Sequence, residues 1–466
     1  MNTRLEKFSE YIKGKKVALI GAGISNMAAV DFLLSRGAVV SVRDKRESLD
    51  SPASAELEKK GIEVFLGDGY LDGIYEDILF KSPGIRPDVP ELLSATSRGA
   101  LLTSEMEVFL DICPAKKYAV TGSDGKTTTT TLVAKISEEH IKNTRGGGKV
   151  YLGGNIGTPL LPLADKMTEN DIAVVELSSF QLFSMKAHID SAVITNITPN
   201  HLNWHLSMEE YKEAKAKIFE EQTENDRLVL NFENDITRSF GERAKSDVIF
   251  FSSIRDPGTK KAIFLRGEEI LFRDGNTEKK IMERSDIKLP GLHNVENYMA
   301  ACASLMGTVF ETDILNVART FPGVEHRIEF VCEKHGVKYY NSSIDTSPTR
   351  SAAALRSFKD KLIVIVGGYD KKIPLEPLAP LLSEKARFIS ATGATGKKIM
   401  QIMLDAGYPV DKIVYTEDFD GAFLAAKNAA KAGDTVILSP ACASFDAFKN
   451  FESRGEYFKS LVEKIK

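Results

Sequence analysis

A strand, a glycine-bounded turn and a helix start follow one another in residues 117–132, KYAVTGSDGKTTTTTL, and this order constrains the fold more than any other segment. Gly122 and Gly125 let the backbone wrap closely around an anion, and the N–H groups that open the following helix point towards it. In such a loop Lys126 reaches the terminal phosphates of a nucleotide, and the hydroxyl of Thr127 holds Mg²⁺. The spacing is G-x-x-G-K-T, because Val120 stands where a phosphate loop has its first glycine. A plain turn before a threonine-rich helix is the alternative interpretation.

The bulk composition indicates a soluble protein of several domains. A chain of 466 residues exceeds what a single core supports, so we expect two to four domains. Hydrophobic content of 43% and charged content of 27% fit an ordinary soluble globular protein. The net charge of −4 argues against a nucleic-acid partner, which would usually need a basic face. The sequence shows neither a membrane span nor an apolar leader segment, and we expect no membrane insertion. The four cysteines are far apart, which suits a reducing cytoplasm without a zinc site.

The N-terminal segment reads as a βαβ unit. A strand at 16–20 runs into the glycine turn 21–26 and a helix to about residue 36, and a second strand at 39–42 precedes Asp44. This pattern is typical of a dinucleotide site. Asn26 replaces the third glycine, however. An NAD site, another phosphate-bearing ligand and plain packing therefore all stay open at this point.

Alternating strands and helices continue to the end of the chain and predict three α/β domains, at 1–104, 105–322 and 323–466. In the second domain the apolar strands 172–175 and 192–195 end on polar residues. Ligands of open α/β sheets sit at the carboxyl ends of strands, so Glu176, Asn196 and the His201 region should approach the phosphate loop. The third domain is predicted to contain buried strands at 337–340, 362–366, 388–390 and 435–438.

Several side chains in the central segment are candidates for chemistry. Glu176 ends an apolar strand and is placed like a Mg²⁺-binding acid, with a solvated strand-end glutamate as the equal alternative. Residues 196–205 bring two of the seven histidines together with the only tryptophan, which favours a functional His201. The lysine-rich segment 211–217 reads instead as a solvated helix face, and this pattern does not select Lys215.

The later segments offer groups that suit a nucleotide and a carboxylate. Asn294 and Asn297 lie three residues apart on one helical face and suit an adenine edge, although Asn294 also suits a helix cap. Arg327, just past a domain boundary, offers a cation for a phosphate. Ser444 lies where a strand leads into a helix, a cradle for a carboxylate, and Lys371 offers a matching charge.

Taken together, the ordered motifs resemble the Mur ligases of bacterial cell-wall synthesis across essentially the whole chain. The motifs are TGSDGKTTT, GGNIG, ELSSFQL, NHLNWH, the lysine helix, GLHNVENYMAA, HRIE and LSPACASFDAFKNFESRG. The last of them looks like the branch of the family that adds D-glutamate. The resemblance implies a Rossmann-like UDP-binding domain, a central P-loop ATPase domain with a mostly parallel sheet, and a C-terminal Rossmann-like domain that binds the amino acid.

The activity implied by the resemblance is that of an ADP-forming amide ligase in peptidoglycan precursor synthesis, which serves cell shape and division. ATP phosphorylates the carboxylate of UDP-N-acetylmuramoyl-L-alanine, and the amine of D-glutamate attacks the acyl phosphate. This chemistry needs positioning and charge neutralisation more than a protein nucleophile. We further expect a cytoplasmic monomer.

The resemblance also assigns residues to roles. Catalysis falls to Lys126, Glu176, His201, Lys215 and Asn155, with Asn155 near the activated carboxylate. Thr127 and Glu176 hold a first Mg²⁺, and His201 and Lys215, the latter as a carbamate, serve a second. The nucleotide is bound by Gly122, Ser123, Asp124, Gly125, Lys126, Thr127, Thr128, Asn294, Asn297 and Arg327. UDP is bound by Ser25, Asp44, Arg46, Ser82 and Gly84, which replaces the NAD interpretation. D-glutamate is bound by Thr346, Lys371, Ser444 and Phe451.

The chain departs from the family pattern at residues 341–347, which read NSSIDTS where N-D-S-[KI]-A-[TS]-[NS] is usual. Ser342 replaces an aspartate expected near the nucleotide, and Asp345 is a new acid. Asn203 and Asp124 are smaller departures, where HLD and GTNGK are common. We hypothesise that nucleotide affinity or domain closure is altered, with Asp345 compensating. Other readings are a ligase for another amino acid, a folylpolyglutamate synthase-like enzyme, a nicotinamide dehydrogenase and a non-catalytic relative.

Overall fold

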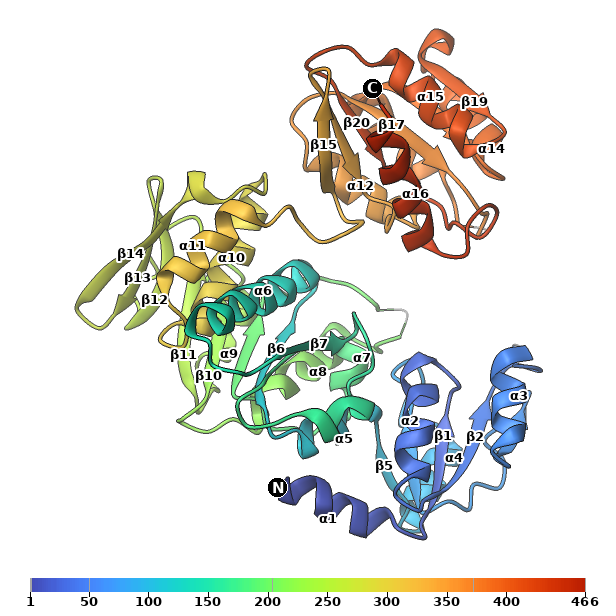
Figure 1. Ribbon diagram of the computed structural model, residues 1–466, viewed down its shortest axis with the longest axis vertical. Helices are drawn as coiled ribbons and strands as arrows, with labels where there is room; N and C mark the ends of the chain where they lie inside the picture. The colour runs from blue at the N-terminus through green and yellow to red at the C-terminus, as the bar shows by residue number, and fades with distance from the viewer. Residues whose placement is uncertain (1, 50, 203, 372, 466) are drawn as a thin grey trace. The chain divides into compact units, whose positions relative to one another are not determined.

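The computed structural model describes residues 2–49, 51–202, 204–371 and 373–465 (Figure 1). The chain divides into two compact units, one formed by Met1–Ile287 with Leu292–Thr320 and the other by Lys288–Gly291 with Phe321–Lys466. In the described ranges the strands belong to three sheets, each rich in parallel pairs, which confirms the predicted α/β class. None of the helices in those ranges is long and apolar enough to span a bilayer.

The first sheet, in the N-terminal part of the first unit, is parallel throughout, with the order β3-β2-β1-β4-β5. The strand order reverses between β1 and β4, so the loops that follow these two strands open a crevice at their carboxyl ends. The predicted first strand has the predicted bounds. The elements are α1 Thr3–Ile12, β1 Lys16–Ile20, α2 Ile24–Leu34, β2 Val39–Asp44, α3 Ser51–Lys59, β3 Glu63–Leu66, β4 Ile78–Lys81, α4 Pro90–Ser97 and β5 Leu101–Thr103.

The second sheet has the order β14-β13-β12-β11-β10-β9-β6-β8-β7. It is parallel from β7 to β12, and β12, β13 and β14 form an antiparallel extension that the sequence reading missed. Gly267 and Gly275, both with positive φ, make the two tight turns of this extension and were its sequence signal. The elements are α5 Glu105–Ile112, β6 Lys116–Thr121, α6 Lys126–Thr144, β7 Val150–Gly154, β8 Ile172–Glu176, α7 Ser179–Leu182, β9 Ser191–Ile194, α8 Met208–Glu220, β10 Arg227–Asn231, α9 Asp235–Phe240, β11 Asp247–Ser252, β12 Lys261–Arg266, β13 Glu269–Asp274, β14 Thr277–Glu283, α10 Leu292–Leu305 and α11 Glu311–Thr320.

The third sheet belongs to the second unit and has the order β15-β16-β20-β17-β18-β19, with β15 antiparallel and the other pairs parallel. Its strands contain the four segments predicted as buried. The elements are β15 Glu329–Lys334, β16 Val337–Asn341, α12 Pro348–Arg356, β17 Leu362–Gly367, α13 Ala379–Lys385, β18 Ala386–Thr392, α14 Gly396–Asp405, β19 Ile413–Thr416, α15 Phe419–Ala429, β20 Thr435–Leu438 and α16 Phe451–Glu463.

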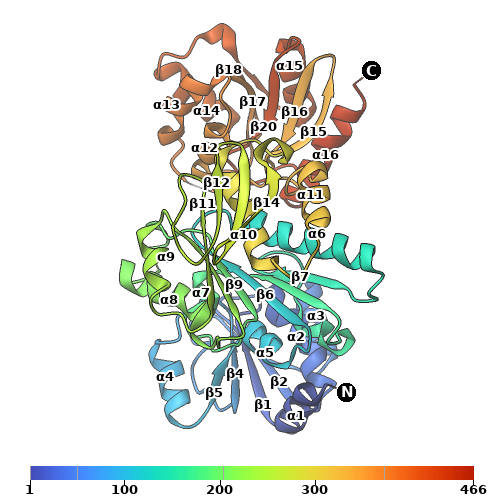
Figure 2. The same ribbon diagram turned by 90° about the vertical axis from the view of Figure 1, so that its left-hand side faces the viewer.

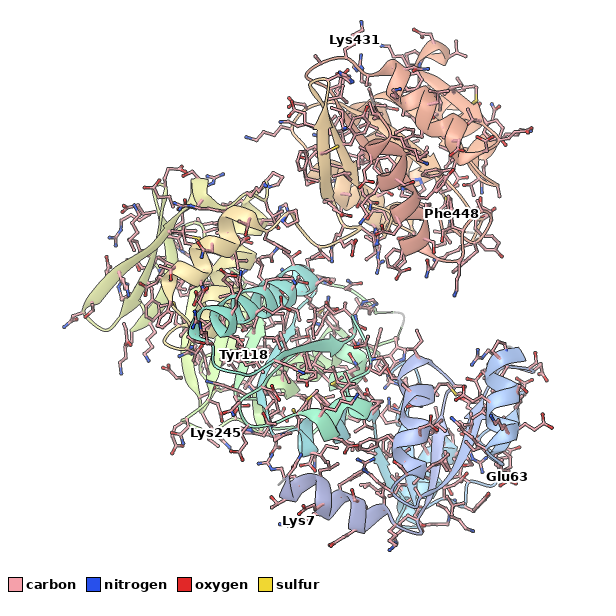
Figure 3. The ribbon with its side chains drawn as sticks, in the orientation of Figure 1. Lys7, Glu63, Tyr118, Lys245, Lys431 and Phe448 are labelled. Carbon is pink, nitrogen blue, oxygen red and sulfur yellow. The ribbon has the colours of Figure 1, made fainter. Side chains whose placement is uncertain are left out.

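Helices cover both faces of the central sheet, which explains why its strands are apolar runs and not alternating patterns. Helices α6 and α10 pack together and contact several strands, whereas α8 contacts β6 and β9. Figure 2 shows α8 and α9 on one side of this sheet and α6 on the other. The side chain of Tyr118 on β6 is buried between the layers, while Lys245 and Lys431 are exposed (Figure 3). The loop between β6 and α6 therefore begins at the carboxyl end of a strand that is packed between two layers of helices.

Candidate functional site

The loop between β6 and α6 has the backbone of a phosphate cradle. Gly122 has φ 148° and Gly125, which precedes the first residue of α6, has φ 79°. Both conformations favour glycine. A Cβ on Gly122 would collide with the Thr195 hydroxyl, and one on Gly125 would collide with the Asn297 side chain. The two glycines are therefore required by conformation and by close approach.

Lys126 begins α6 and folds back over this loop. Its Nζ donates hydrogen bonds to the carbonyls of Gly122 and Ser123 at 3.0 and 2.9 Å. Around it, Ser123 Oγ lies 2.9 Å from the Tyr211 hydroxyl, and the N–H of Asp124 donates to Asn196 Oδ1 at 2.9 Å. The ammonium group thus lies inside the cradle, within reach of an anion held there. Thr128 follows in the first turn of α6 and is half-buried.

Glu176 joins this loop to the neighbouring strand. It ends β8, which pairs with β6, and it is only 2% exposed, so the alternative of a solvated strand-end glutamate is wrong. Thr127 Oγ1 donates to Glu176 Oε2 at 2.8 Å, and Asn155 Nδ2 donates to Oε1 at 2.8 Å. A hydroxyl and a carboxylate thus meet beside the loop, and these oxygen ligands suit Mg²⁺.

Lys215 overturns the prediction of a solvated helix face. It is 1% exposed, and its Nζ donates to the Gly122 carbonyl at 2.8 Å and to Thr121 Oγ1 at 3.3 Å. Burial, with the charge of Lys126, holds the pKa of Lys215 well below its usual range. The signal was present in the sequence: Tyr211, Ala214 and Ile218 form the apolar stripe of α8, and position 215 belongs to that stripe.

The two histidines of the 200–205 segment have different surroundings. His201 has φ 55°, and partial desolvation together with Lys126 and Lys215 lowers its pKa, which favours the neutral, metal-binding imidazole. His205 is buried, with Nε2 2.9 Å from Ser179 Oγ and Nδ1 3.3 Å from Glu210 Oε1. The predicted role of His201 is thus compatible with its position, whereas His205 is held by structural contacts. Asn203, named above as a departure, lies outside the described residues.

The two predicted adenine-binding amides lie at the start of α10. Asn297 is buried, accepts a hydrogen bond from Thr129 Oγ1 at 3.2 Å and donates to Asn294 Oδ1 at 3.3 Å. Asn294 lies inside the helix, two residues after its first residue Leu292, and therefore not at a cap position. Asn297 in this way joins α10 to α6, the helix that follows the glycine loop.

A pocket of about 690 Å³ lies at the carboxyl ends of β1, β2 and β4. Asp44, Arg46, Ser82 and Gly84 line it, together with the 21–23 turn, whereas Ser25 is not among its lining residues. Asp44 accepts hydrogen bonds from Ala22 N at 2.7 Å and from Arg46 Nε at 2.9 Å. The Arg46 hydrogen bond is the main cause that lowers the pKa of Asp44 to about 2.

Asn26 explains why the third glycine is missing from this turn, and sequence reasoning gave it no such role. Its Nδ2 donates to the carbonyls of Ile20 and Phe80 at 3.1 Å and of Gly21 at 2.9 Å. The amide thereby clamps the ends of β1 and β4 together. A Cβ on Gly21 would also collide with Ser82. The pocket walls are set by these close contacts.

In the second unit the predicted D-glutamate residues lie on loops at the carboxyl ends of strands. Ser444 is buried on the loop after β20, and Phe451 begins α16. Lys371 is exposed on the loop after β17, and Tyr369 N donates to the Ala443 carbonyl at 2.9 Å, so these two loops lie side by side. Lys371 and Ser444 thus share one end of the sheet.

Arg454 supports this loop and was not selected from the sequence. Its buried guanidinium donates to the carbonyls of Ala443, Cys442 and Ser343 at 3.0, 3.1 and 2.9 Å. Ser343 Oγ in turn donates to the Phe451 carbonyl at 2.7 Å. The sequence offered one signal for Arg454. It lies three residues after Phe451 in the last motif, and residues three apart lie on the same face of a helix.

The residues of the unusual 341–347 motif are buried or half-buried in the second unit. Ser342 is fully buried, and its Oγ accepts a hydrogen bond from Ile328 N at 3.2 Å. Asp345 is buried too, and Ser439 Oγ donates to its carboxylate at 2.8 Å. Burial raises the pKa of Asp345 to about 6. The half-buried Thr346 follows directly, while Arg327 belongs to the same unit, just before β15.

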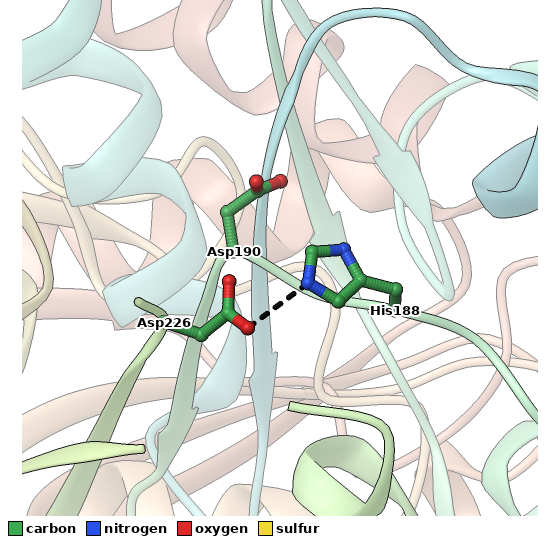
Figure 4. Close-up of side chains that lie close together, drawn as sticks. All are labelled: His188, Asp190 and Asp226. Carbon is green, nitrogen blue, oxygen red and sulfur yellow. Dashed lines mark hydrogen bonds and ion pairs between the residues drawn. The ribbon is translucent and has the colours of Figure 1, made fainter. Parts of the chain in front are cut away.

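A separate cluster of His188, Asp190 and Asp226 lies just before the first residues of β9 and β10 (Figure 4). This is the end of the central sheet opposite to the phosphate loop. Their ligand atoms lie within 4.8 Å of one another. Asp190 already accepts Lys117 N at 2.8 Å, and Asp226 accepts Thr223 N and Oγ1 at 2.7 and 2.8 Å. These carboxylates anchor the starts of strands and have no contact with the phosphate loop.

Comparisons with known proteins cover nearly all of the chain. Residues 15–104 match the Mur ligase MurD-like N-terminal domain, residues 120–305 the Mur ligase middle domain, and residues 326–442 the Mur ligase glutamate ligase domain. The UDP-N-acetylmuramoylalanine--D-glutamate ligases of Acetivibrio thermocellus and Clostridium novyi are 48% and 45% identical, with 100% of both chains covered in each case.

Solved structures agree with this at the level of the fold. The UDP-N-acetylmuramate-alanine ligase MurC of Thermotoga maritima has a TM-score of 0.57 at 21% identity and covers 97% of this chain and 100% of its own. MurF of Acinetobacter baumannii has a TM-score of 0.56 at 16% identity, with 98% and 92% covered. The matched domains and the full-length relatives show that the chain belongs to the Mur ligase family, in its MurD-like group.

Proposed function

We propose that this chain joins the amino group of D-glutamate to the carboxylate of UDP-N-acetylmuramoyl-L-alanine and converts ATP to ADP and phosphate. The Thr127–Glu176–Asn155 constellation beside the glycine loop carries the proposal, because it places oxygen ligands and an amide donor where a triphosphate would end. The two substrates are those in the name of the full-length relatives, UDP-N-acetylmuramoylalanine--D-glutamate ligase.

The glycine loop and its neighbours fit a Mg²⁺–nucleotide complex. Lys126, already inside the cradle, would hold the β- and γ-phosphates, and the N–H groups opening α6 would face them. Thr127 and Glu176 would hold the metal, and Asn155 fixes the orientation of that carboxylate. Bound Mg²⁺ supplies neutralisation of the phosphate charge.

The reaction then proceeds in two transfers. A carboxylate oxygen of the UDP-linked substrate attacks the γ-phosphorus, the bond to the ADP oxygen breaks, and an acyl phosphate forms. The amine of D-glutamate attacks the acyl carbon, loses a proton, and phosphate leaves as the amide forms. Lys126 would stabilise charge in the first transfer. Asn155 Nδ2 donates one N–H to Glu176, and its second N–H would serve the activated carboxylate.

We also propose that Lys215 acts as a carbamate. Only a neutral amine attacks CO₂, and the burial that lowers the pKa of Lys215 favours that neutral form. The product is an anion with two oxygens, next to the Gly122 carbonyl, and close enough to His201 for the charge of Lys215 to affect the pKa of that imidazole. Such a group, together with neutral His201, would hold a second Mg²⁺.

The division of labour follows the predicted domains. Residues 1–104 would bind the UDP moiety in the 690 Å³ pocket, 105–322 would bind ATP, and 323–466 would bind D-glutamate on the loops after β17 and β20. Roles for Ser25, Thr346, Lys371, Ser444 and Phe451 stay proposals of the same kind. That the chain acts as a cytoplasmic monomer also stays a prediction from the sequence.

The test is release of ADP from ATP in the presence of each substrate alone and of both. We expect turnover only when UDP-N-acetylmuramoyl-L-alanine and D-glutamate are both present. Glu176→Gln should lower kcat by about 100-fold or more, because it weakens a metal ligand that positions the phosphates. The matched change at exposed Glu169, to glutamine, should leave kcat unaltered. Equal turnover with D-glutamate omitted would contradict the proposal.

A further inference from the structure

Trp204 is the exceptional member of the nucleotide pocket. The other residues that line the pocket come from the first sheet and its loops, up to Val89, whereas Trp204 comes from the loop between β9 and α8. Its indole Nε1 donates a hydrogen bond to the Gly84 carbonyl at 2.9 Å. One wall of the pocket is therefore supplied by the segment that also carries His201.

Arg86 fastens this loop from the pocket side. Its Nη1 donates to the Trp204 carbonyl at 2.8 Å, and its guanidinium carbon lies 5.0 Å from the centroid of the indole ring. The same guanidinium makes a two-pronged ion pair with Glu210, at 2.9 and 3.1 Å. Arg86 thus binds both ends of the segment between Trp204 and the start of α8.

Glu210 links Arg86 to helix α8, which also carries Lys215. It lies in the first turn of α8, accepts a hydrogen bond from Leu206 N at 3.0 Å and lies 3.3 Å from His205 Nδ1. Arg86 is the main cause that lowers the pKa of Glu210, so this carboxylate stays ionised. Further along the same helix, Tyr211 contacts the phosphate loop through Ser123, and Lys215 contacts it through Gly122.

His201 belongs to the same turn as Trp204. The N–H groups of Trp204 and His205 both donate to the His201 carbonyl at 3.0 Å. The Phe180 ring packs against both side chains, with centroid distances of 5.0 Å to His201 and 4.8 Å to Trp204. The Phe180 ring and the two backbone hydrogen bonds to the His201 carbonyl thus connect the indole with the histidine.

We infer that Trp204, Arg86 and Glu210 are positioning residues that couple filling of the pocket by a nucleoside diphosphate to the placement of His201 and α8 at the metal-binding end of the phosphate loop. A ligand in the pocket meets the indole directly, and the Arg86–Glu210 pair transmits its position to the helix. The inference rests on the proposed function for the identity of the coupled sites. The pocket-side half can be tested without turnover.

The chain contains one tryptophan, so emission excited at the red edge of the absorption, where tyrosine does not absorb, reports this residue alone. UDP is titrated into the full-length protein without ATP, and binding is measured in parallel by calorimetry. We expect a saturable change in Trp204 emission with the calorimetric midpoint. In Glu210→Gln, which does not line the pocket, UDP should still bind within about twofold of the wild-type affinity, but the emission change should shrink. Heat of binding without an emission change in the wild type, or no binding of UDP, would overturn the inference.

The second arm uses turnover and the Mg²⁺ requirement. Glu210→Gln should raise the Mg²⁺ concentration for half-maximal rate by about tenfold and lower kcat, as expected for a partner that orients metal ligands, with KM for the UDP substrate nearly unaltered. Asp88→Asn is the matched control, because Asp88 pairs with Arg86 from the exposed side. It should leave all three constants within about twofold.

Arg86→Lys gives an independent check should the glutamine variant fold poorly. A lysine keeps the charge but loses the two-pronged geometry, so the Mg²⁺ requirement should rise by less than in Glu210→Gln. The inference would be overturned if Glu210→Gln raised only the KM for the UDP substrate. Equal effects of Asp88→Asn and Glu210→Gln would overturn it too. A wild type that binds UDP with the emission change but never releases ADP would instead contradict the proposed function.

Discussion

Replacing Asp345 by asparagine isolates the cost of a carboxylate inside the second unit. The residue is 4% exposed, and Ser439 Oγ donates to it at 2.8 Å. Burial raises its pKa from 3.8 to about 6, against the opposing charges of Arg327 and Arg350. Asparagine has nearly the same shape, keeps an oxygen acceptor for the Ser439 hydroxyl and carries no charge.

The sign follows from proton linkage. A carboxyl whose pKa is higher in the folded state than in the unfolded chain contributes fully to stability below the unfolded pKa of 3.8, and this contribution is lost as the pH rises through about 6. At about 1.4 kcal/mol per pH unit, the loss approaches about 3 kcal/mol above pH 7 and is roughly half of that near pH 5. Asp345→Asn should therefore stabilise the second unit, and more so at neutral pH.

Amide hydrogen exchange in β17 measures this effect within the second unit. The strand pairs with β20, and the N–H of Ser439 donates to the Ile365 carbonyl, so its amides report opening around Asp345. We expect protection to rise by about 100-fold near pH 7 and by about tenfold near pH 5. The control is Asp360→Asn, an exposed carboxylate of the same unit, which should change protection little at either pH.

A variant with equal or lower protection near pH 7 would refute the reasoning. That result would mean that the hydrogen bonds from Ser342 and Ser439, together with the charges of the two arginines, outweigh the desolvation cost of the carboxylate. A gain of the same size at both pH values would equally contradict it, because packing and not ionisation would then be the cause.

Three further experiments test the phosphate loop, the carbamate on Lys215 and the unusual 341–347 motif. Gly122→Ala should abolish ATP binding in calorimetry while circular dichroism stays native-like, because the added Cβ collides with a side chain at a φ that disfavours alanine; retained affinity would contradict the strained-loop argument. Activity of the wild type should fall in bicarbonate-free buffer and return when bicarbonate is added. Lys215→Arg should lose about 100-fold or more in kcat, and added bicarbonate should not restore it. Full activity without CO₂ would exclude the carbamate. Ser342→Asp should change the KM for ATP if the unusual motif alters nucleotide affinity, and an unchanged KM would reject that hypothesis.

Much of the fold could be read from local pattern. Apolar runs bounded by glycine and polar residues predicted β1, β8, β9 and β17 to within a residue or two. The glycine loop at Gly122–Lys126 was also predictable, because the conformational freedom of glycine and the order of strand, turn and helix belong to one short segment. The extension β12–β14 was missed, although β12 and β13 carry short buried apolar runs on either side of a glycine turn. Only its outermost strand, β14, is mostly exposed and lacks such a run.

The site itself needed the tertiary structure. Composition predicted a solvated Lys215, yet the packing of α8 on the central sheet buries it against the Gly122 carbonyl. In the sequence Asn26 only replaces the third glycine of the turn, yet it joins two strands that are more than fifty residues apart. Trp204 is a neighbour of the two histidines in the sequence, yet it lines a pocket of the first sheet.

By itself, then, the sequence determined the β–loop–α units and the residue types at their tips, because these depend on neighbours along the chain. Which helix face turns inward, and which distant loops meet at one sheet edge, was decided only by the tertiary structure. The physical reason is that burial is a property of the assembled layers. Desolvation lowers the pKa of Lys215 and raises that of Asp345 only once those layers have closed around them.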